Sequence, residues 1–171
     1  MRSLFQFQLI NAVEKEIGMN WKPLMSKAEA EEYTRDSWYQ GQDFYHGTNQ
    51  SAADSITSEG ARIESESVNT YGEGFYLAFV KKTAEDYARL TKSPLVLTAR
   101  VDVRKPRKFR DSIDFEGFLL ENNISADDLQ SRTASKLLIS QGFDAVEIGG
   151  DRILVIIFNR TQIAIFQSEQ V

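Results

Sequence analysis

The chain has 171 residues and contains no cysteine, a single histidine and three prolines. Without cysteine, disulfide bonds, thiolate nucleophiles and zinc-thiolate sites are excluded. Because His46 is the only histidine, a histidine-rich metal site is excluded too, and we expect no metal cofactor. Positive charge is also in the minority, with 20 lysines and arginines against 25 aspartates and glutamates and a net charge of -5. Proteins that bind nucleic acid usually present a basic face, so we do not expect nucleic acid as a partner.

Long apolar runs are absent as well. The first apolar residues, from Leu4 to Ile10, are interrupted by glutamines and are too few for a signal-peptide core or a membrane span. We therefore expect a soluble protein that does not enter membranes and is either cytoplasmic or exported by a route that leaves no signal peptide. The 42% of hydrophobic residues is enough for a sizeable core, and no linker or repeat divides the chain. One globular unit is expected.

Apolar spacing and capping residues predict the local elements. A capping box of Ser26 and Glu29 predicts a helix over residues 27–35. The same kinds of signal predict further helices and a series of short strands. The expected helices lie at 4–17, 51–58, 81–90 and 131–141, with a short helix somewhere in 106–123. One strand is expected to end near His46, and the others are expected at 75–78, 95–103, 143–148, 153–158 and 163–166. Residues 61–70 are expected to form a loop over the cleft that binds the ligand.

Residues 100–110 carry six of the basic residues and stand out in an acidic protein. Such a run is most simply a solvated strand-and-turn edge. The same run is also suited to binding an acidic partner, and the sequence leaves both interpretations open.

The residues suited to chemistry gather between Asp43 and Leu90. The histidine lies in the run Tyr-His-Gly-Thr, and a second cluster, Tyr-Gly-Glu-Gly-Phe-Tyr-Leu-Ala, begins at Tyr71. Glycine is favoured where the backbone takes a positive φ or approaches a ligand, which makes Gly72 and Gly74 candidates for such a loop. The pair lacks the third glycine and the following helix of a dinucleotide fingerprint, so it does not predict a Rossmann site.

The order of these motifs resembles the ADP-ribosyltransferase domains of the diphtheria-toxin and poly(ADP-ribose) polymerase type. The resemblance extends from Phe44 to about Phe166 and is most specific between His46 and Tyr87. It implies an α+β fold, a split twisted β-sandwich, over residues 43–171, with residues 1–42 as a helical extension packed on this core. It also implies NAD as the substrate.

Residue by residue, the resemblance implies the following roles. His46 would hydrogen-bond the ribose of the adenosine half of NAD, and the backbone of Gly47 would bind the nicotinamide amide. Tyr76 and Tyr87 would hold the nicotinamide ring between them, as two aromatic faces do well for a flat heteroaromatic group. Thr48 and Gly74, which belong to the same motifs, complete the expected NAD-binding set.

The third catalytic position departs from the pattern of this family. Counting back from Gln162 places Leu154 where a glutamate is usual, and Asp151 or Glu147 could replace it if the strand is bulged or shifted. Family members with an aliphatic residue there resemble mono-ADP-ribosyltransferases, in which an acidic acceptor can supply the carboxylate. The missing glutamate also argues against elongation of an ADP-ribose chain. We therefore expect transfer of one ADP-ribose to a protein acceptor; the alternative is an inactive module that binds NAD or ADP-ribose.

Overall fold

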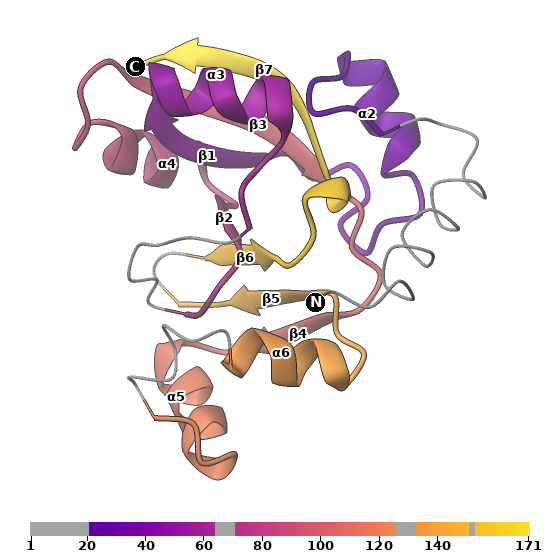
Figure 1. Ribbon diagram of the computed structural model, residues 1–171, viewed down its shortest axis with the longest axis vertical. Helices are drawn as coiled ribbons and strands as arrows, with labels where there is room; N and C mark the ends of the chain where they lie inside the picture. The colour runs from indigo at the N-terminus through magenta and orange to yellow at the C-terminus, as the bar shows by residue number, and fades with distance from the viewer. Residues whose placement is uncertain (1–20, 64–70, 126–132, 151–152) are drawn as a thin grey trace, which may run out of the picture.

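Seven strands form one mixed β-sheet in the order β4-β5-β6-β2-β1-β3-β7 (Figure 1). The computed structural model describes residues 21–63, 71–125, 133–150 and 153–171. Its strands are β1 Phe44–Asn49, β2 Phe75–Ala78, β3 Pro94–Val101, β4 Pro106–Phe109, β5 Ala145–Ile148, β6 Leu154–Ile157 and β7 Ile163–Gln170. Its α-helices are α2 Lys27–Tyr33, α3 Gln50–Glu59, α4 Lys81–Ala88, α5 Ser112–Glu121 and α6 Thr133–Ser140. The expected α+β class is confirmed.

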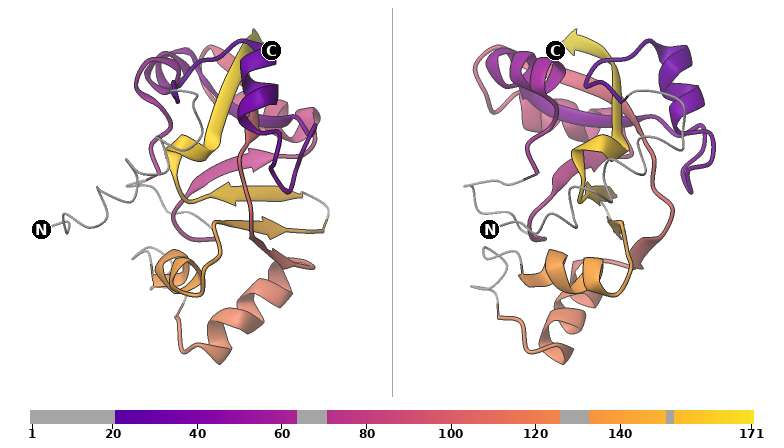
Figure 2. Two further views of the ribbon diagram at one scale, coloured as in Figure 1. Left: turned by 90° about the vertical axis from the view of Figure 1, so that its right-hand side faces the viewer. Right: turned by 45° about the vertical axis from the view of Figure 1, so that its right-hand side comes forward.

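The sheet has two halves that meet at one pair of residues. In one half, β1 pairs with β3 over six positions and β3 pairs with β7 over seven. In the other half, β2–β6, β6–β5 and the parallel pair β5–β4 each extend over four positions. The halves are joined where Tyr45 pairs with Ala78, and no further pair links β1 to β2, both of which are fully described. Figure 2 shows that β7 runs across the direction of β5 and β6.

The two faces of the sheet bury different clusters of side chains. One face packs with α3 and buries residues such as Phe44, Leu77 and Val155. The other face is covered by α4 over the β1–β2 region and by α5 and α6 over β4 and β5. A fully buried Leu or Phe side chain contributes about 1.5–3 kcal/mol of hydrophobic free energy, so these clusters fix the positions of the helices.

Residues 21–33 pack beside β7. The backbone amide of Met25 donates to the carbonyl oxygen of Ile165 at 2.8 Å, and the Tyr33 hydroxyl donates to the carbonyl oxygen of Thr161 at 2.6 Å. The predicted capping box is present at the start of α2, where Ser26 and Glu29 each accept a hydrogen bond from the backbone amide of the other. These contacts attach the helix to the outer edge of the sheet.

Several elements differ from the sequence-based expectation. The strand expected at 163–166 continues to Gln170 because it pairs with β3 along its whole length. The segment 106–123 contains the edge strand β4 before its helix, which is longer than expected. The helix predicted at 4–17 and most of the loop predicted at 61–70 lie outside the described residues. Within the described residues, no helix has the length and apolar character needed to cross a membrane.

Candidate functional site

His46 and Tyr76 meet where β1 and β2 separate. The Nδ1 atom of His46 lies 2.9 Å from the backbone carbonyl oxygen of Tyr76. Because a carbonyl oxygen can only accept a hydrogen bond, Nδ1 carries the proton and donates. In the neutral ring Nε2 then has a free electron pair, so it is the atom able to accept a hydrogen bond from a ligand. We call Tyr45, His46, Tyr76 and Ala78 the β1–β2 junction.

The surroundings of His46 keep the ring neutral. Its ring centroid lies 4.3 Å from that of Phe75 at an interplanar angle of 30°. Desolvation by burial lowers the pKa of His46 below its ordinary value of 6.5, and this effect exceeds the opposite effect of the hydrogen bond to Tyr76. Residue His46 is still partly accessible to solvent. A neutral imidazole with an accepting Nε2 is therefore the form present at neutral pH.

Gly47 brings α4 directly against β1. A Cβ atom added at Gly47 would lie 1.9 Å from the carbonyl oxygen of Ala84 and 2.9 Å from the backbone nitrogen of Ala88. The helix therefore approaches the strand backbone more closely than any side chain permits. The next residue, Thr48, is buried with 8% exposure, whereas Tyr87 on α4 is 45% exposed. Close packing at Gly47 thus determines where α4 places Tyr87.

Tyr76 is held by its own loop. Its hydroxyl donates to the carbonyl oxygen of Gly72 at 2.6 Å and accepts from the backbone amide of Tyr71 at 3.0 Å. Burial raises the pKa of the Tyr76 hydroxyl above its ordinary value, so it stays protonated. Gly74 is required by packing, since a Cβ there would lie 2.4 Å from Cγ2 of Ile156. The ring of Tyr76 is consequently fixed in the fold before any ligand binds.

Leu154 opens β6 and lies beside these residues. It is 8% exposed and pairs with Ala78 on one side and with Ile148 on the other. Its side chain belongs to a buried cluster against which Tyr76 packs and to which α4 contributes two alanines; the cluster comprises Ala78, Ala84, Ala88, Val96 and Leu154. The Leu154 side chain is thus surrounded by apolar side chains of this cluster. Asp151, the other candidate for this position, lies outside the described residues.

Glu147 is not placed to replace a carboxylate at Leu154. It pairs with Val155, whose side chain lies on the opposite face of the sheet from that of Leu154, because neighbouring residues in a strand alternate. Its carboxylate already accepts the Tyr39 hydroxyl at 2.6 Å and pairs with Nζ of Lys108 at 2.9 Å. The structure therefore places Glu147 on the other face of the sheet from Leu154, away from the third catalytic position.

The structure brings three of the predicted residues, His46, Tyr76 and Leu154, together in one region. His46 contacts the backbone of Tyr76, while Tyr76, Leu154 and the alanines of α4 share one cluster. Sequence reasoning did not predict the supporting roles of Tyr71 and Phe75, although both lie in the glycine-containing segment that drew attention to Tyr76. Among the described residues, no group of three or more acidic or histidine side chains is arranged to hold a metal ion.

No protein-family model matches the chain, and no curated protein matches it either. The residues of the β1–β2 junction and their motifs are the features of the chain that point to a function.

Proposed function

We propose that the protein is a mono-ADP-ribosyltransferase that transfers ADP-ribose from NAD to a protein acceptor and releases nicotinamide. The observation that carries the proposal is the hydrogen bond between His46 Nδ1 and the Tyr76 carbonyl oxygen, 2.9 Å long. It joins the two motifs that resemble ADP-ribosyltransferases at the point where the sheet divides into halves. A sheet so divided fits the split twisted β-sandwich that binds NAD in that family.

In this proposal each residue of the site has a separate task. Nε2 of His46 accepts a hydroxyl of the adenosine ribose, because Nδ1 is already used as a donor. Tyr76, with its hydroxyl fixed by the loop, provides a preset aromatic face for nicotinamide, and Tyr87 provides the second face from α4. Each aromatic pair contributes about 0.5–1.5 kcal/mol beyond burial. The backbone of Gly47 binds the nicotinamide amide.

The reaction is a substitution at the ribose carbon that bears nicotinamide. The carbon–nitrogen bond to nicotinamide breaks, its electron pair leaves with the neutral nicotinamide, and the acceptor oxygen forms the new bond to carbon. With an ionised carboxylate as the acceptor, its negative charge cancels the positive charge of the nicotinamide ring of NAD, and no proton has to be removed. The protein contributes by orienting NAD and excluding water, which lowers the barrier through positioning more than through covalent chemistry.

Leu154 limits what the site can transfer to. A glutamate at this position would hold the ribose hydroxyls and polarise a hydroxyl acceptor, whereas the buried leucine, 8% exposed, does neither. An acidic acceptor side chain brings its own carboxylate and needs no such polarisation. The proposed acceptor is therefore an aspartate or glutamate of another protein, and the proposed product carries a single ADP-ribose.

The same leucine supports a second candidate function. A site that retains His46, Tyr76 and Tyr87 but has an apolar residue at position 154 is suited to bind NAD or ADP-ribose without turnover. Such a module would use the same contacts and release no nicotinamide.

Transfer of label from adenylate-labelled NAD to the protein and to a whole-cell lysate tests the proposal. We expect labelled bands with the wild-type chain and clearly weaker bands with His46→Asn at an NAD concentration below the dissociation constant of the wild type. The amide nitrogen of Asn can replace Nδ1 as the donor to the Tyr76 carbonyl, whereas nothing in Asn replaces Nε2. The fold is therefore retained and only the ligand contact is removed, which thermal melting checks. Bound NAD without any label would favour the second candidate, and equal labelling by both proteins would overturn the assignment of His46.

A further inference from the structure

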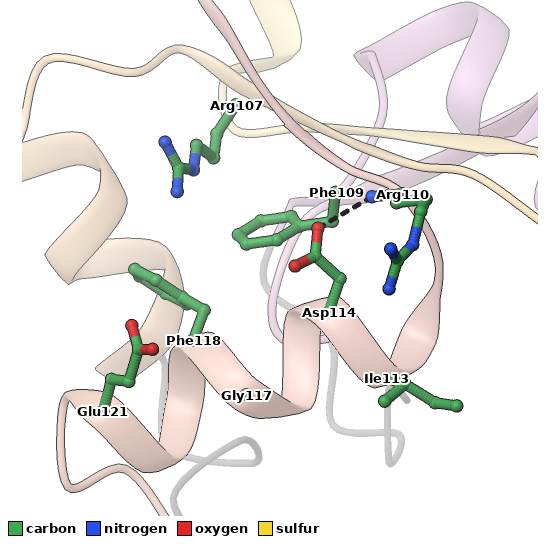
Figure 3. Close-up of a pocket in the computed structure, with 8 residues that line it drawn as sticks. All are labelled: Arg107, Phe109, Arg110, Ile113, Asp114, Gly117, Phe118 and Glu121. Carbon is green, nitrogen blue, oxygen red and sulfur yellow. Dashed lines mark hydrogen bonds between the residues drawn. The ribbon is translucent and has the colours of Figure 1, made fainter.

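A second candidate site lies beside the core contacts of α5 and shares Phe109 and Phe118 with them. It is a groove of about 290 Å³ between β4 and α5, and we call it the β4–α5 groove (Figure 3). Its lining combines two guanidinium groups, two carboxylates and apolar side chains: Arg107, Phe109, Arg110, Ile113, Asp114, Gly117, Phe118 and Glu121. None of the residues assigned to NAD lines it. A function for this groove therefore does not depend on the proposed transferase activity.

Gly117 in α5 has no explanation in the fold. It lies inside the helix and does not have the positive φ that requires glycine elsewhere in the fold. A Cβ added there would meet no described atom within 4 Å. A glycine inside a helix costs about 1 kcal/mol relative to alanine. This contrasts with Gly47 and Gly74, where a Cβ would clash. A glycine that lines a groove and is not needed for packing marks a place where another molecule approaches the helix backbone closely.

Arg107 lines the groove without an ion pair to any acidic side chain of the described residues. Its guanidinium lies 5.3 Å from the ring centroid of Phe109 and 5.7 Å from that of Phe143. Within the described parts of the chain no carboxylate forms an ion pair with Arg107, whereas Arg110 pairs with Asp111 at 3.2 Å. A guanidinium stacked on aromatic rings is held in place while its N–H groups remain able to bind a carboxylate.

Three other basic residues of this run form ion pairs within the protein, and Nζ of Lys105 lies 4.9 Å from the ring centroid of Phe143. Arg100 pairs with Asp43 and Glu31, Arg104 pairs with Asp102, and Lys108 pairs with Glu147. The basic run is thus not a uniform positive surface. The positive charge that remains without an acidic partner in the groove is concentrated at Arg107.

The carboxylates of the groove lie on the α5 wall. Asp114 accepts the backbone amide of Arg110 at 2.9 Å, shown dashed in Figure 3, and so has a structural role. Glu121 lies near the end of the helix, on the far wall from Arg107 in the same view. An acidic ligand is therefore attracted by Arg107 on the β4 wall and repelled by Glu121 on the α5 wall, so its charge must lie against β4.

The outer side of α5 adds apolar surface to this charge. Ile113 is 73% exposed and lines the groove, and Leu120, 76% exposed, lies beside it along the helix. The opposite side of α5 is buried through Phe115, Phe118 and Leu119, so the helix is apolar on two sides. Large side chains exposed next to a groove are typical of surfaces that bind other proteins.

We propose that the β4–α5 groove binds a peptide segment of a partner protein in which an acidic residue lies beside a bulky apolar residue. The carboxylate pairs with Arg107, and the apolar side chain packs against the α5 backbone at Gly117, between Phe118 and Ile113. This apolar side chain can approach the α5 backbone so closely only because residue 117 has no side chain.

Random dodecapeptides displayed on phage provide the probe, selected against the full chain without NAD and then measured individually by fluorescence anisotropy. We expect enriched peptides to contain Asp or Glu within two positions of a bulky apolar residue. Amidation of that acid should weaken binding about tenfold, as the loss of a central interface contact does. Glu121→Gln should tighten binding, because it removes a repulsive charge.

Two matched substitutions separate the groove from general effects on α5. Gly117→Gln fills the groove, whereas Glu116→Gln places the same side chain on a neighbouring exposed position outside the lining. Glutamine has a higher helix propensity than glycine, so Gly117→Gln should melt no lower than the wild type. We expect it to weaken binding at least about tenfold, as should Arg107→Glu, while Glu116→Gln stays within about twofold. Enriched peptides that bind Gly117→Gln as tightly as the wild type, or no acid-dependent peptide at all, would overturn the proposal.

Discussion

Gly47→Ala offers the clearest test of how the candidate site is built. In the wild type the backbone of α4 lies so close to β1 that a Cβ at position 47 would be 1.9 Å from the Ala84 carbonyl oxygen. Raising that separation to an ordinary contact of 3.4 Å requires a displacement of about 1.5 Å. The clashing atoms belong to a helix backbone, so a change of rotamer cannot relieve the contact. Either α4 or β1 must move.

Two opposing effects determine how much Gly47→Ala changes the free energy of unfolding. Overpacking of a well-packed region typically costs about 1–3 kcal/mol and sometimes more. Replacement of glycine by alanine restricts the unfolded chain, which returns about 0.4–1 kcal/mol. Because the clash is with backbone, we expect a net loss of about 2 kcal/mol, which corresponds to a fall in Tm of roughly 4–8 °C for a chain of this size. The displacement of α4 should also move Tyr87 and weaken NAD binding.

Urea unfolding and thermal melting measure this effect, and Gly117→Ala is the matched control. A Cβ at Gly117 meets open space, so the same substitution should stabilise the protein by about 0.5–1 kcal/mol through helix propensity. Opposite signs at the two positions would support the account. A neutral or stabilising Gly47→Ala would show that α4 does not pack on β1 as described.

Three further substitutions test the surroundings of the site. Because the fold lowers the pKa of His46, the unfolded chain binds a proton at this residue first when the pH falls below about 6.5. The free energy of unfolding should therefore fall by up to about 1.4 kcal/mol per pH unit. Urea titrations of His46→Asn should lack this pH-dependent loss of stability. Leu154→Glu places a carboxylate in an apolar cluster, so it should lower the Tm at pH 7 and do so less at pH 5, where the acid is more often neutral; an equal loss at both pH values would contradict the burial. Tyr39→Phe removes a hydrogen bond from Glu147 and should cost about 1–2 kcal/mol in chemical denaturation, with an unchanged stability arguing against that bond.

Elements encoded by nearby residues were predictable from the sequence. The box at Ser26 and Glu29 lies within four residues and starts α2 as expected. The apolar runs flanking Gly149 and Gly150 pair as the antiparallel strands β5 and β6. In such cases the signal is local, because a cap or a turn needs few residues to satisfy its own backbone groups.

Features that depend on distant partners were not predictable. β4 is a short basic segment, and its strand character comes from parallel pairing with β5, which follows two intervening helices. The close approach at Gly47 is visible only once α4 is placed. From the sequence alone, the glycine could be needed equally well for contact with a ligand or for packing of a helix. The role of Glu147 likewise depends on Tyr39, which is 108 residues away. Long-range packing decides these cases, whereas local preference does not.

Calorimetric titration with NAD tests most directly the claim that the β1–β2 junction is a nucleotide site. We predict one NAD bound per wild-type chain and a dissociation constant raised about three- to tenfold in His46→Asn and in Tyr87→Leu, the effect of losing one hydrogen bond or one stacking face. Glu116→Gln, remote from the junction on α5, should bind as the wild type does. Absence of binding to the wild type, or equal affinity in all four proteins, would contradict the account.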